Sequence, residues 1–193
     1  SALVRLPADI TSQELMRTVA NLNGDDSVDG LLVQLPLPGH LEPEPVVAAI
    51  SPLKDVDCFH AENLGLLLRG LPRFAPCTPS GIMRILDSLD VDFAGKDAVV
   101  VGRSLIVGRP LAMLLIERDM TVTVCHSKTT DLPDKVRQAD LVVAAVGVPG
   151  LVKGDWLKPG ATVIDVGTYR PDRRAPLDTL KGVPGDAVIH GSP

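Results

Sequence analysis

The sequence predicts an α/β protein of two lobes, and the C-terminal lobe is expected to be a Rossmann-like, doubly wound parallel sheet. Apolar, strand-like runs alternate with helix-like segments, and short connections join them, which is typical of that fold class. Pro72, Pro76 and Pro79 cluster near the middle of the chain and indicate a domain boundary. We therefore expect one lobe over residues 1–76 and a second over residues 77–193.

The N-terminal lobe, also predicted to be α/β, should begin with a helix. The run TSQELMRTVANLN (11–23) opens with a T-x-x-E capping-box spacing and repeats apolar residues on one helical face. The run VDGLLVQLPLP (28–38) is almost continuously apolar and ends at prolines, which favours a strand covered on both faces. A short helix is expected in PEPVVAAI (43–50), whereas SPLKDVDCFHAENLG (51–65) shows neither periodicity.

The C-terminal lobe should alternate helices and strands. CTPSGIMRILDSLD (77–90) predicts a helix with Thr78 as its cap and Pro79 at the first helical position. Strands are expected in the apolar runs that follow, namely 95–102, 121–127, 140–147 and 161–167. Helices are expected between them at 107–118 and 130–139, with a helical turn at 153–160. No element is assigned after Gly167.

The composition argues against several classes of protein. The chain has 193 residues, of which 45% are hydrophobic and 22% charged, and its net charge is −5. This balance gives no support for binding to nucleic acid or to an anionic membrane. No apolar stretch is long enough to cross a bilayer, and no signal-peptide pattern is present.

The cysteines and histidines predict neither disulfides nor a metal site. Cys58, Cys77 and Cys125 are far apart and odd in number, with no C-x-x-C spacing. The four histidines also lack a metal-ligand spacing. We therefore expect reduced thiols in an intracellular, cytoplasmic protein with no bound metal.

The turn between the predicted strand at 95–102 and the helix at 107–118 is a candidate phosphate site. The first amides of a helix lack partners within it and lie at the positive end of its dipole, and glycine lets an anion approach closely. Gly102 ends the strand and Gly108 begins the helix. Ser104 replaces the middle glycine of G-x-G-x-x-G, and the loop is one residue longer. A plain turn that needs glycine only for its geometry is the alternative.

The residues at the end of the next predicted strand indicate whether the cofactor is NAD or NADP. An NAD site usually has an acidic residue there, about 20 residues after the first glycine, for the ribose 2′-hydroxyl. CHSKTT (125–130) contains no acid and offers His126, Ser127 and Lys128, while Arg103 lies in the glycine turn. A 2′-phosphate favours such donors and positive charges. We therefore expect the cofactor to be NADP.

Six stretches together resemble the bifunctional methylenetetrahydrofolate dehydrogenase/cyclohydrolase family: DGLLVQLPLP, PLKDVDCFH, PCTPSGIMRIL, GRSLIVGRP, TVTVCHSKT and PGATVIDVG. Their order and spacing match over about residues 10–168. The resemblance implies oxidation of 5,10-methylene-tetrahydrofolate by NADP, then hydrolysis of the 5,10-methenyl product to 10-formyl-tetrahydrofolate. It also implies a cytoplasmic homodimer that serves one-carbon metabolism and purine biosynthesis.

The resemblance implies roles for several residues on the cofactor side. Gly102, Arg103 and Ser104 match the turn that holds the NADP phosphates. Ser127 matches a contact to the 2′-phosphate of the adenosine. Thr168 matches a backbone position beside the nicotinamide. The residues 77–193 therefore resemble an NADP-binding domain, and residues 1–76 resemble the folate-side catalytic lobe.

Gln34 and Asp57 are the candidates on the folate side. Gln34 matches the glutamine that bonds the family's catalytic lysine, and Asp57 matches the aspartate that holds the pterin ring. A carboxylate can accept paired hydrogen bonds from a 2-amino-pyrimidinone edge. From the residues alone, Gln34 could equally be a satisfied glutamine in the core, and Asp57 could stabilise its own loop through an Asx turn.

The sequence departs from the family pattern at several points. The family's Y-x-x-x-K lysine should lie before the first predicted helix, and the printed chain, which begins at Ser1, has no such motif. We therefore expect the N-terminal part of the folate-side lobe to be missing and cyclohydrolase activity of this chain to be low. Cys58 replaces a usual glycine, Tyr169 replaces a usual asparagine, and the ending VPGDAVIHGSP lacks the family's TPVPGGVGPMT. A non-catalytic relative that binds only NADP or folate is the alternative.

Overall fold

The computed structural model describes residues 1–148 and 150–166, and the backbone of residues 188–191. The chain forms two compact units, Ser1–Pro76 and Cys77–Pro193. Within the described residues, no helix is both long enough and apolar enough to span a membrane.

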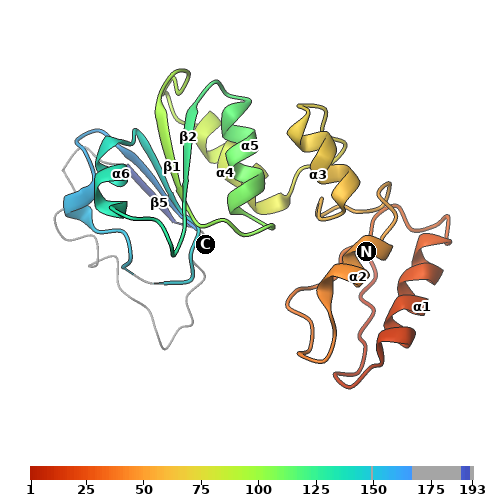
Figure 1. The fold of residues 1–193 in the computed structure, drawn as a ribbon. Helices are drawn as coiled ribbons and strands as arrows, with labels where there is room; N and C mark the ends of the chain where they lie inside the picture. Colours follow the sequence, from red (N-terminus) through yellow and green to blue (C-terminus); the bar gives the residue numbers. More distant parts are fainter. Residues whose placement is uncertain (149, 167–187, 192–193) are drawn as a thin grey trace. The chain divides into compact units, whose positions relative to one another are not determined.

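The second unit is built on a parallel sheet with the strand order β2-β1-β3-β4-β5 (Figure 1). Every neighbouring pair of these strands runs parallel. The strands are β1 (Asp97–Val101), β2 (Thr121–Cys125), β3 (Leu141–Ala144), β4 (Thr162–Asp165) and β5 (Val188–Gly191). The first four lie within the runs that the sequence predicted, whereas β5 forms in the segment to which no element was assigned.

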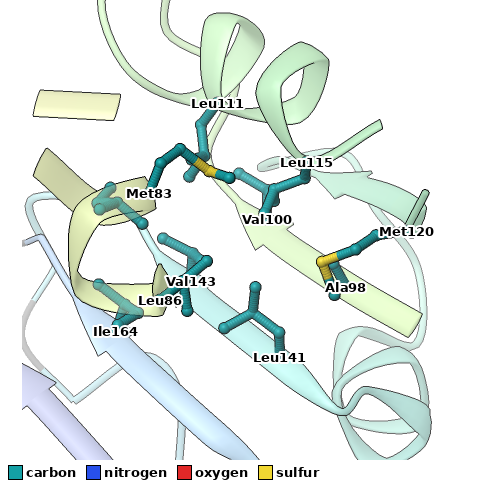
Figure 2. Packing of buried hydrophobic residues seen from close by; sticks show 11 residues of the cluster. Met83, Leu86, Ala98, Val100, Leu111, Leu115, Met120, Leu141, Val143 and Ile164 are labelled. Carbon is teal, nitrogen blue, oxygen red and sulfur yellow. The ribbon is translucent and has the colours of Figure 1, made fainter. Parts of the chain in front are cut away.

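Helices cover both faces of the sheet, which confirms the doubly wound fold. α4 (Cys77–Asp87) and α5 (Gly108–Ile116) pack on one face, as Figure 2 shows for Met83 and Leu86 of α4 and Leu111 and Leu115 of α5. Residues of α6 (Leu132–Gln138) and the short 3-10 helix Gly154–Trp156 pack on the other face.

Alternating strand residues supply the two cores. Ala98 and Val100 of β1 pack in the cluster with α4 and α5, while Val99 and Val101 pack in the cluster with α6. Successive side chains of a strand point to opposite faces, so a strand covered on both faces must be apolar throughout. This explains the near-continuous apolar sequences of β1 and β3, whereas the edge strand β2 is largely exposed and alternates threonine with valine.

The predicted start of α4 is wrong by two residues. The helix begins at Cys77, so Thr78 is a helical residue and Pro79 lies third rather than first. Proline is tolerated there because the first amides of a helix have no acceptor within the helix. The missing amide of Pro79 therefore removes no helical hydrogen bond.

The first unit contains three helices, α1 (Ser12–Asn23), α2 (Pro43–Ala49) and α3 (Ala61–Leu68). Thr11 and Glu14 form the predicted capping box at the start of α1. The core joins α1 and α2 to the segment between them through Leu15, Val19, Leu31, Leu41, Val46 and Ile50.

Two predictions for this unit are wrong. Residues 28–38 form no strand: only Leu31 pairs with another segment, in a single parallel bridge to Asp55, and Leu32 is 54% exposed. A strand needs a neighbour along its length, and Pro36 and Pro38 have no amide to donate. In addition, α3 forms in and beyond a stretch for which no helix was predicted. The residue that caps it is His60, which is not a usual capping residue, so the start of the helix was not visible in the sequence.

Candidate functional site

The turn after β1 requires glycine at both of its ends. Gly102 has a φ of +125°, and a Cβ there would lie 2.3 Å from the carbonyl oxygen of Ala145. A Cβ on Gly108 would lie 2.2 Å from the carbonyl oxygen of Gly102. These contacts are to backbone atoms, which cannot move aside as a flexible side chain would. The two glycines thus let β1, the end of β3 and the start of α5 approach each other closely.

Ser104 organises the start of α5. Its Oγ accepts hydrogen bonds from the amides of Val107 (3.1 Å) and Gly108 (3.3 Å), and its carbonyl oxygen accepts one from Arg109 (3.0 Å). The expectation that the amides at the mouth of this helix are unpaired is therefore wrong for these three residues. The N-cap residue of α5 is Val107, which makes no side-chain capping hydrogen bond, so Ser104 fixes the loop that leads into the helix rather than capping it.

The loop that precedes these amides is the part of the turn open to an anion. Within the described part of the chain, the amides of residues 103–106 make no hydrogen bond. Arg103 and Ser104 are exposed, and the side chains of Leu105 and Ile106 are 50% and 42% exposed. Four amides and a guanidinium group therefore lie at the surface of this loop, where they can donate to phosphate oxygens.

A second turn, residues 126–129, begins at the same edge of the sheet. The pairing of β1 with β2 ends at Val101 opposite Cys125, and the Gly102 amide donates to the carbonyl oxygen of Cys125 (2.9 Å). The exposed side chains of Ser127 and Lys128 lie at the tip of this second turn. No carboxylate occurs in residues 126–130. Both candidate anion-binding segments thus follow neighbouring strands.

The topology places these turns where parallel sheets bind ligands. From β1 the chain order runs to β2 on one side and to β3 on the other, so the strand order reverses between β1 and β3. In open α/β sheets, ligands bind outside the carboxyl ends of the strands at such a reversal. The close approach of Gly102 to Ala145 occurs at this point. Thr168, the predicted contact beside the nicotinamide, lies outside the described residues, as does Tyr169.

In the first unit, the two acids of KDVD have separate environments. Asp55 is 1% exposed, and its carboxylate accepts hydrogen bonds from the amides of Phe59 (3.1 Å) and His60 (2.9 Å). The side-chain amide of Asn63 donates a third (2.8 Å). Asp55 therefore stabilises this loop, and Asp57 is half-buried.

Gln34 is not a core residue. Its side chain is exposed, and its amide nitrogen donates to the carbonyl oxygen of the next residue, Leu35 (2.9 Å). It lines an apolar cavity of about 410 Å³ together with residues of α1 and of the N-terminal segment. The bridge between Leu31 and Asp55 brings the segments of Gln34 and Asp57 together within this unit.

Cys58 keeps the backbone conformation that glycine would adopt. Its φ is +59°, in the left-handed region, and its side chain is fully buried. Burial, with a smaller contribution from the charge of Asp55, raises the pKa of Cys58 to about 11. The thiol is therefore protonated at neutral pH, and the cysteine preserves the turn at some cost in backbone strain.

Sequence reasoning missed several residues that shape these segments. It assigned Ser104 to phosphate binding, but a serine hydroxyl can also accept the amide of a residue three positions later, as Ser104 does from Val107. It overlooked Thr129, whose position three residues after His126 is that of a side chain closing a turn. Among the described residues, no group of three or more His, Cys, Asp or Glu side chains could hold a metal ion.

Two family models match the chain in succession. The model of the tetrahydrofolate dehydrogenase/cyclohydrolase catalytic domain matches residues 1–57, and that of the NAD(P)-binding domain of the same enzymes matches residues 76–189. The match to the NAD(P)-binding domain includes the two turns described above.

Relatives and solved structures agree with these matches. The bifunctional protein FolD 2 of Geobacter sulfurreducens is 55% identical over 88% of this chain, and the chain spans 60% of that relative. The methylenetetrahydrofolate dehydrogenase/cyclohydrolase FolD of Campylobacter jejuni is 42% identical, with a TM-score of 0.88 over 94% of this chain and 66% of its own. A Trypanosoma brucei FolD complexed with NADP cofactor and inhibitor is 40% identical, with a TM-score of 0.86 over 96% of this chain and 67% of its own.

Proposed function

Because the chain belongs to the tetrahydrofolate dehydrogenase/cyclohydrolase family, we propose that it binds NADP and 5,10-methylene-tetrahydrofolate and takes part in the two reactions of that family. The first is oxidation to the 5,10-methenyl compound, and the second is hydrolysis to 10-formyl-tetrahydrofolate. The observation that carries the proposal is the turn at the strand-order reversal, whose glycines and exposed amides lie inside the matched NAD(P)-binding domain.

The residues of the second unit suit NADP. The amides of residues 103–106 and the guanidinium group of Arg103 would hold the phosphates that join the two nucleosides. Ser127 and Lys128 would hold the 2′-phosphate at the end of β2, where no carboxylate repels it. Gly102 and Gly108 would contribute by their close packing, and Ser104 by fixing the loop.

The residues of the first unit suit a pterin. Asp55 supplies hydrogen bonds that close its loop, and Asp57 lies two residues further along the same loop. A carboxylate at position 57 would accept two hydrogen bonds from the amino-pyrimidinone edge of the folate and orient the ring. Gln34, whose side-chain amide donates to the carbonyl oxygen of Leu35, would orient the family's proton-transferring lysine.

The chemistry needs orientation and electrostatics from the protein. When bound, NADP accepts a hydride from the methylene carbon of the folate. Water then adds to that carbon, the bond from the carbon to N5 breaks, and one proton is released. Asp57 would hold the reacting carbon in position for both steps, and the second step also requires a proton-transferring group beside it.

A binding experiment with the purified chain tests this proposal. Calorimetric titration with NADP, NAD and a non-reactive 5,10-methylene-tetrahydrofolate analogue should show binding of NADP and of the analogue. NADP should bind at least about tenfold more tightly than NAD. Failure to bind NADP would refute the assignment of the second unit, and failure to bind the analogue would refute that of the first.

The remaining expectations from the resemblance stay predictions. They are a homodimeric state, a cytoplasmic location and a role in purine biosynthesis. Analytical ultracentrifugation of the chain would test the first of these.

A further inference from the structure

The turn at residues 126–129 is closed by a local set of hydrogen bonds. The Thr129 hydroxyl oxygen accepts a hydrogen bond from the His126 amide (2.8 Å), and the Thr129 amide donates to the His126 carbonyl oxygen (2.8 Å). The Lys128 amide donates to Nδ1 of His126 (3.1 Å). The two ends of the turn are thus tied to each other twice, once by a side chain.

The turn is also fixed to the sheet. It follows Cys125, which is fully buried and whose carbonyl oxygen accepts the Gly102 amide (2.9 Å). Burial raises the pKa of the Cys125 thiol, and the charge of Lys135 and a hydrogen bond with Thr129 oppose that rise. The half-buried Thr129 therefore bonds His126, the first residue of the turn, which directly follows the last strand residue.

These contacts leave Ser127 and Lys128 exposed at the tip of a constrained turn. We propose that Thr129 is a positioning residue that sets the preference for NADP over NAD, by holding the turn that presents Ser127 and Lys128. This inference rests on the proposed function. It adds Thr129, which does not touch the cofactor itself, to Ser127 and Lys128, which are proposed to touch it.

The physical reason is preorganisation. A hydroxyl or amide that is already held in its binding geometry loses less conformational freedom when the ligand arrives. Without the Thr129 hydroxyl, the His126 amide loses its acceptor, and the turn can adopt other conformations. NADP and NAD differ only in the 2′-phosphate, so a defect confined to this turn weakens the binding of NADP alone.

The test compares three variants by their dissociation constants for NADP and NAD. Thr129→Val keeps nearly the same shape but removes the hydroxyl, Thr129→Ser keeps the hydroxyl, and Thr130→Val changes the exposed neighbouring threonine. We expect Thr129→Val to weaken NADP binding about tenfold, equivalent to about 1.4 kcal/mol, with NAD binding unchanged. Thr129→Ser and Thr130→Val should retain the wild-type ratio of the two constants.

The outcomes separate this inference from the proposed function. If the wild-type chain prefers NADP and Thr129→Val keeps that preference, or loses affinity for both dinucleotides equally, the inference is wrong while the proposed function stands. If Thr129→Val does not fold, the Thr129→Ser variant still tests the inference. A folded Thr129→Ser chain that no longer prefers NADP over NAD would overturn the inference, because this variant keeps the hydroxyl. A wild-type chain that binds NADP no better than NAD would overturn both.

Discussion

Replacing Gly108 by alanine tests the geometry of the cofactor turn most sharply. The new Cβ would lie 2.2 Å from the carbonyl oxygen of Gly102, 2.7 Å from its carbonyl carbon and 3.0 Å from Cα of Arg103. Each of these atoms belongs to the backbone, so the clash can be relieved only if the turn and the start of α5 move apart.

The expected cost follows from comparable overpacking in protein interiors. Forcing an extra methyl group into a well-packed site destabilises proteins by about 1–3 kcal/mol, and the lack of a movable side chain favours the upper end. Gly81 provides the matched control, because it lies inside α4 and a Cβ there meets nothing within 4 Å. Gly81→Ala should therefore stabilise the chain by about 0.5–1 kcal/mol.

Urea unfolding of the wild type and the two variants measures how each substitution changes the free energy of unfolding, and calorimetry measures NADP binding. Gly108→Ala should lose stability and bind NADP at least about tenfold more weakly, because the loop at residues 103–106 moves. Gly81→Ala should gain stability and bind NADP normally. A Gly108→Ala chain as stable as the wild type, with unchanged NADP affinity, would refute this account of the turn.

Three further substitutions test other parts of the structure. Ser127→Asp should weaken NADP binding at least about tenfold and leave NAD binding unchanged or improved, as measured by calorimetry, because a carboxylate repels the 2′-phosphate; an unchanged NADP affinity would argue against this residue. Asp57→Ala should abolish binding of the folate analogue while NADP binding remains, and loss of both in the same titrations would indicate misfolding instead. Partial burial alone would raise the pKa of Asp140, but hydrogen bonds with Lys158 (2.6 Å) and the Asp97 amide (3.0 Å) lower it below its usual value. The contribution of Asp140 to stability is thus present above about pH 4 and is lost as the pH falls through the lowered pKa of the folded state. Asp140→Asn should therefore lower the free energy of unfolding by about 1 kcal/mol at neutral pH. In urea unfolding, the difference in this free energy between the variant and the wild type should shrink in acid.

The strands of the sheet were predictable because burial on both faces requires apolar side chains at consecutive positions, which can be seen directly in the sequence. A parallel strand covered on both faces must be apolar at odd and even positions, and β1 meets this with Ala98 and Val100 on one face and Val99 and Val101 on the other. The same rule failed for residues 28–38, where the residues are apolar but only Leu31 finds a pairing partner. An apolar sequence indicates that a segment is buried, but strand formation also requires a neighbouring segment with which its backbone can pair.

The candidate site was predictable in its position but not in its internal contacts. Two glycines after an apolar strand locate the turn, because few other sequences allow the approach of Gly102 to Ala145. The hydrogen bonds by which Ser104 fixes the loop before α5 and Thr129 closes the second turn depend on side-chain orientation. Spacing alone is compatible with either a ligand contact or a structural hydrogen bond for such hydroxyl groups.

The acids of KDVD illustrate the same limit. The sequence analysis considered a loop-stabilising role for Asp57, and the structure shows that Asp55 accepts the amides of Phe59 and His60. Asp57, which is half-buried, stays the predicted contact to the substrate. A buried carboxylate needs such donors, and which of two neighbouring acids obtains them depends on the fold.

Backbone amide resonances of the chain during titration with NADP and with NAD give the most direct test of the central claim, that two neighbouring turns at the strand-order reversal hold the dinucleotide. With NADP, the largest changes should fall on residues 102–108 and 126–129; with NAD, they should fall on residues 102–108 and spare 126–129. Saturation with NADP that moves neither segment, or that moves residues elsewhere in the chain instead, would contradict the account.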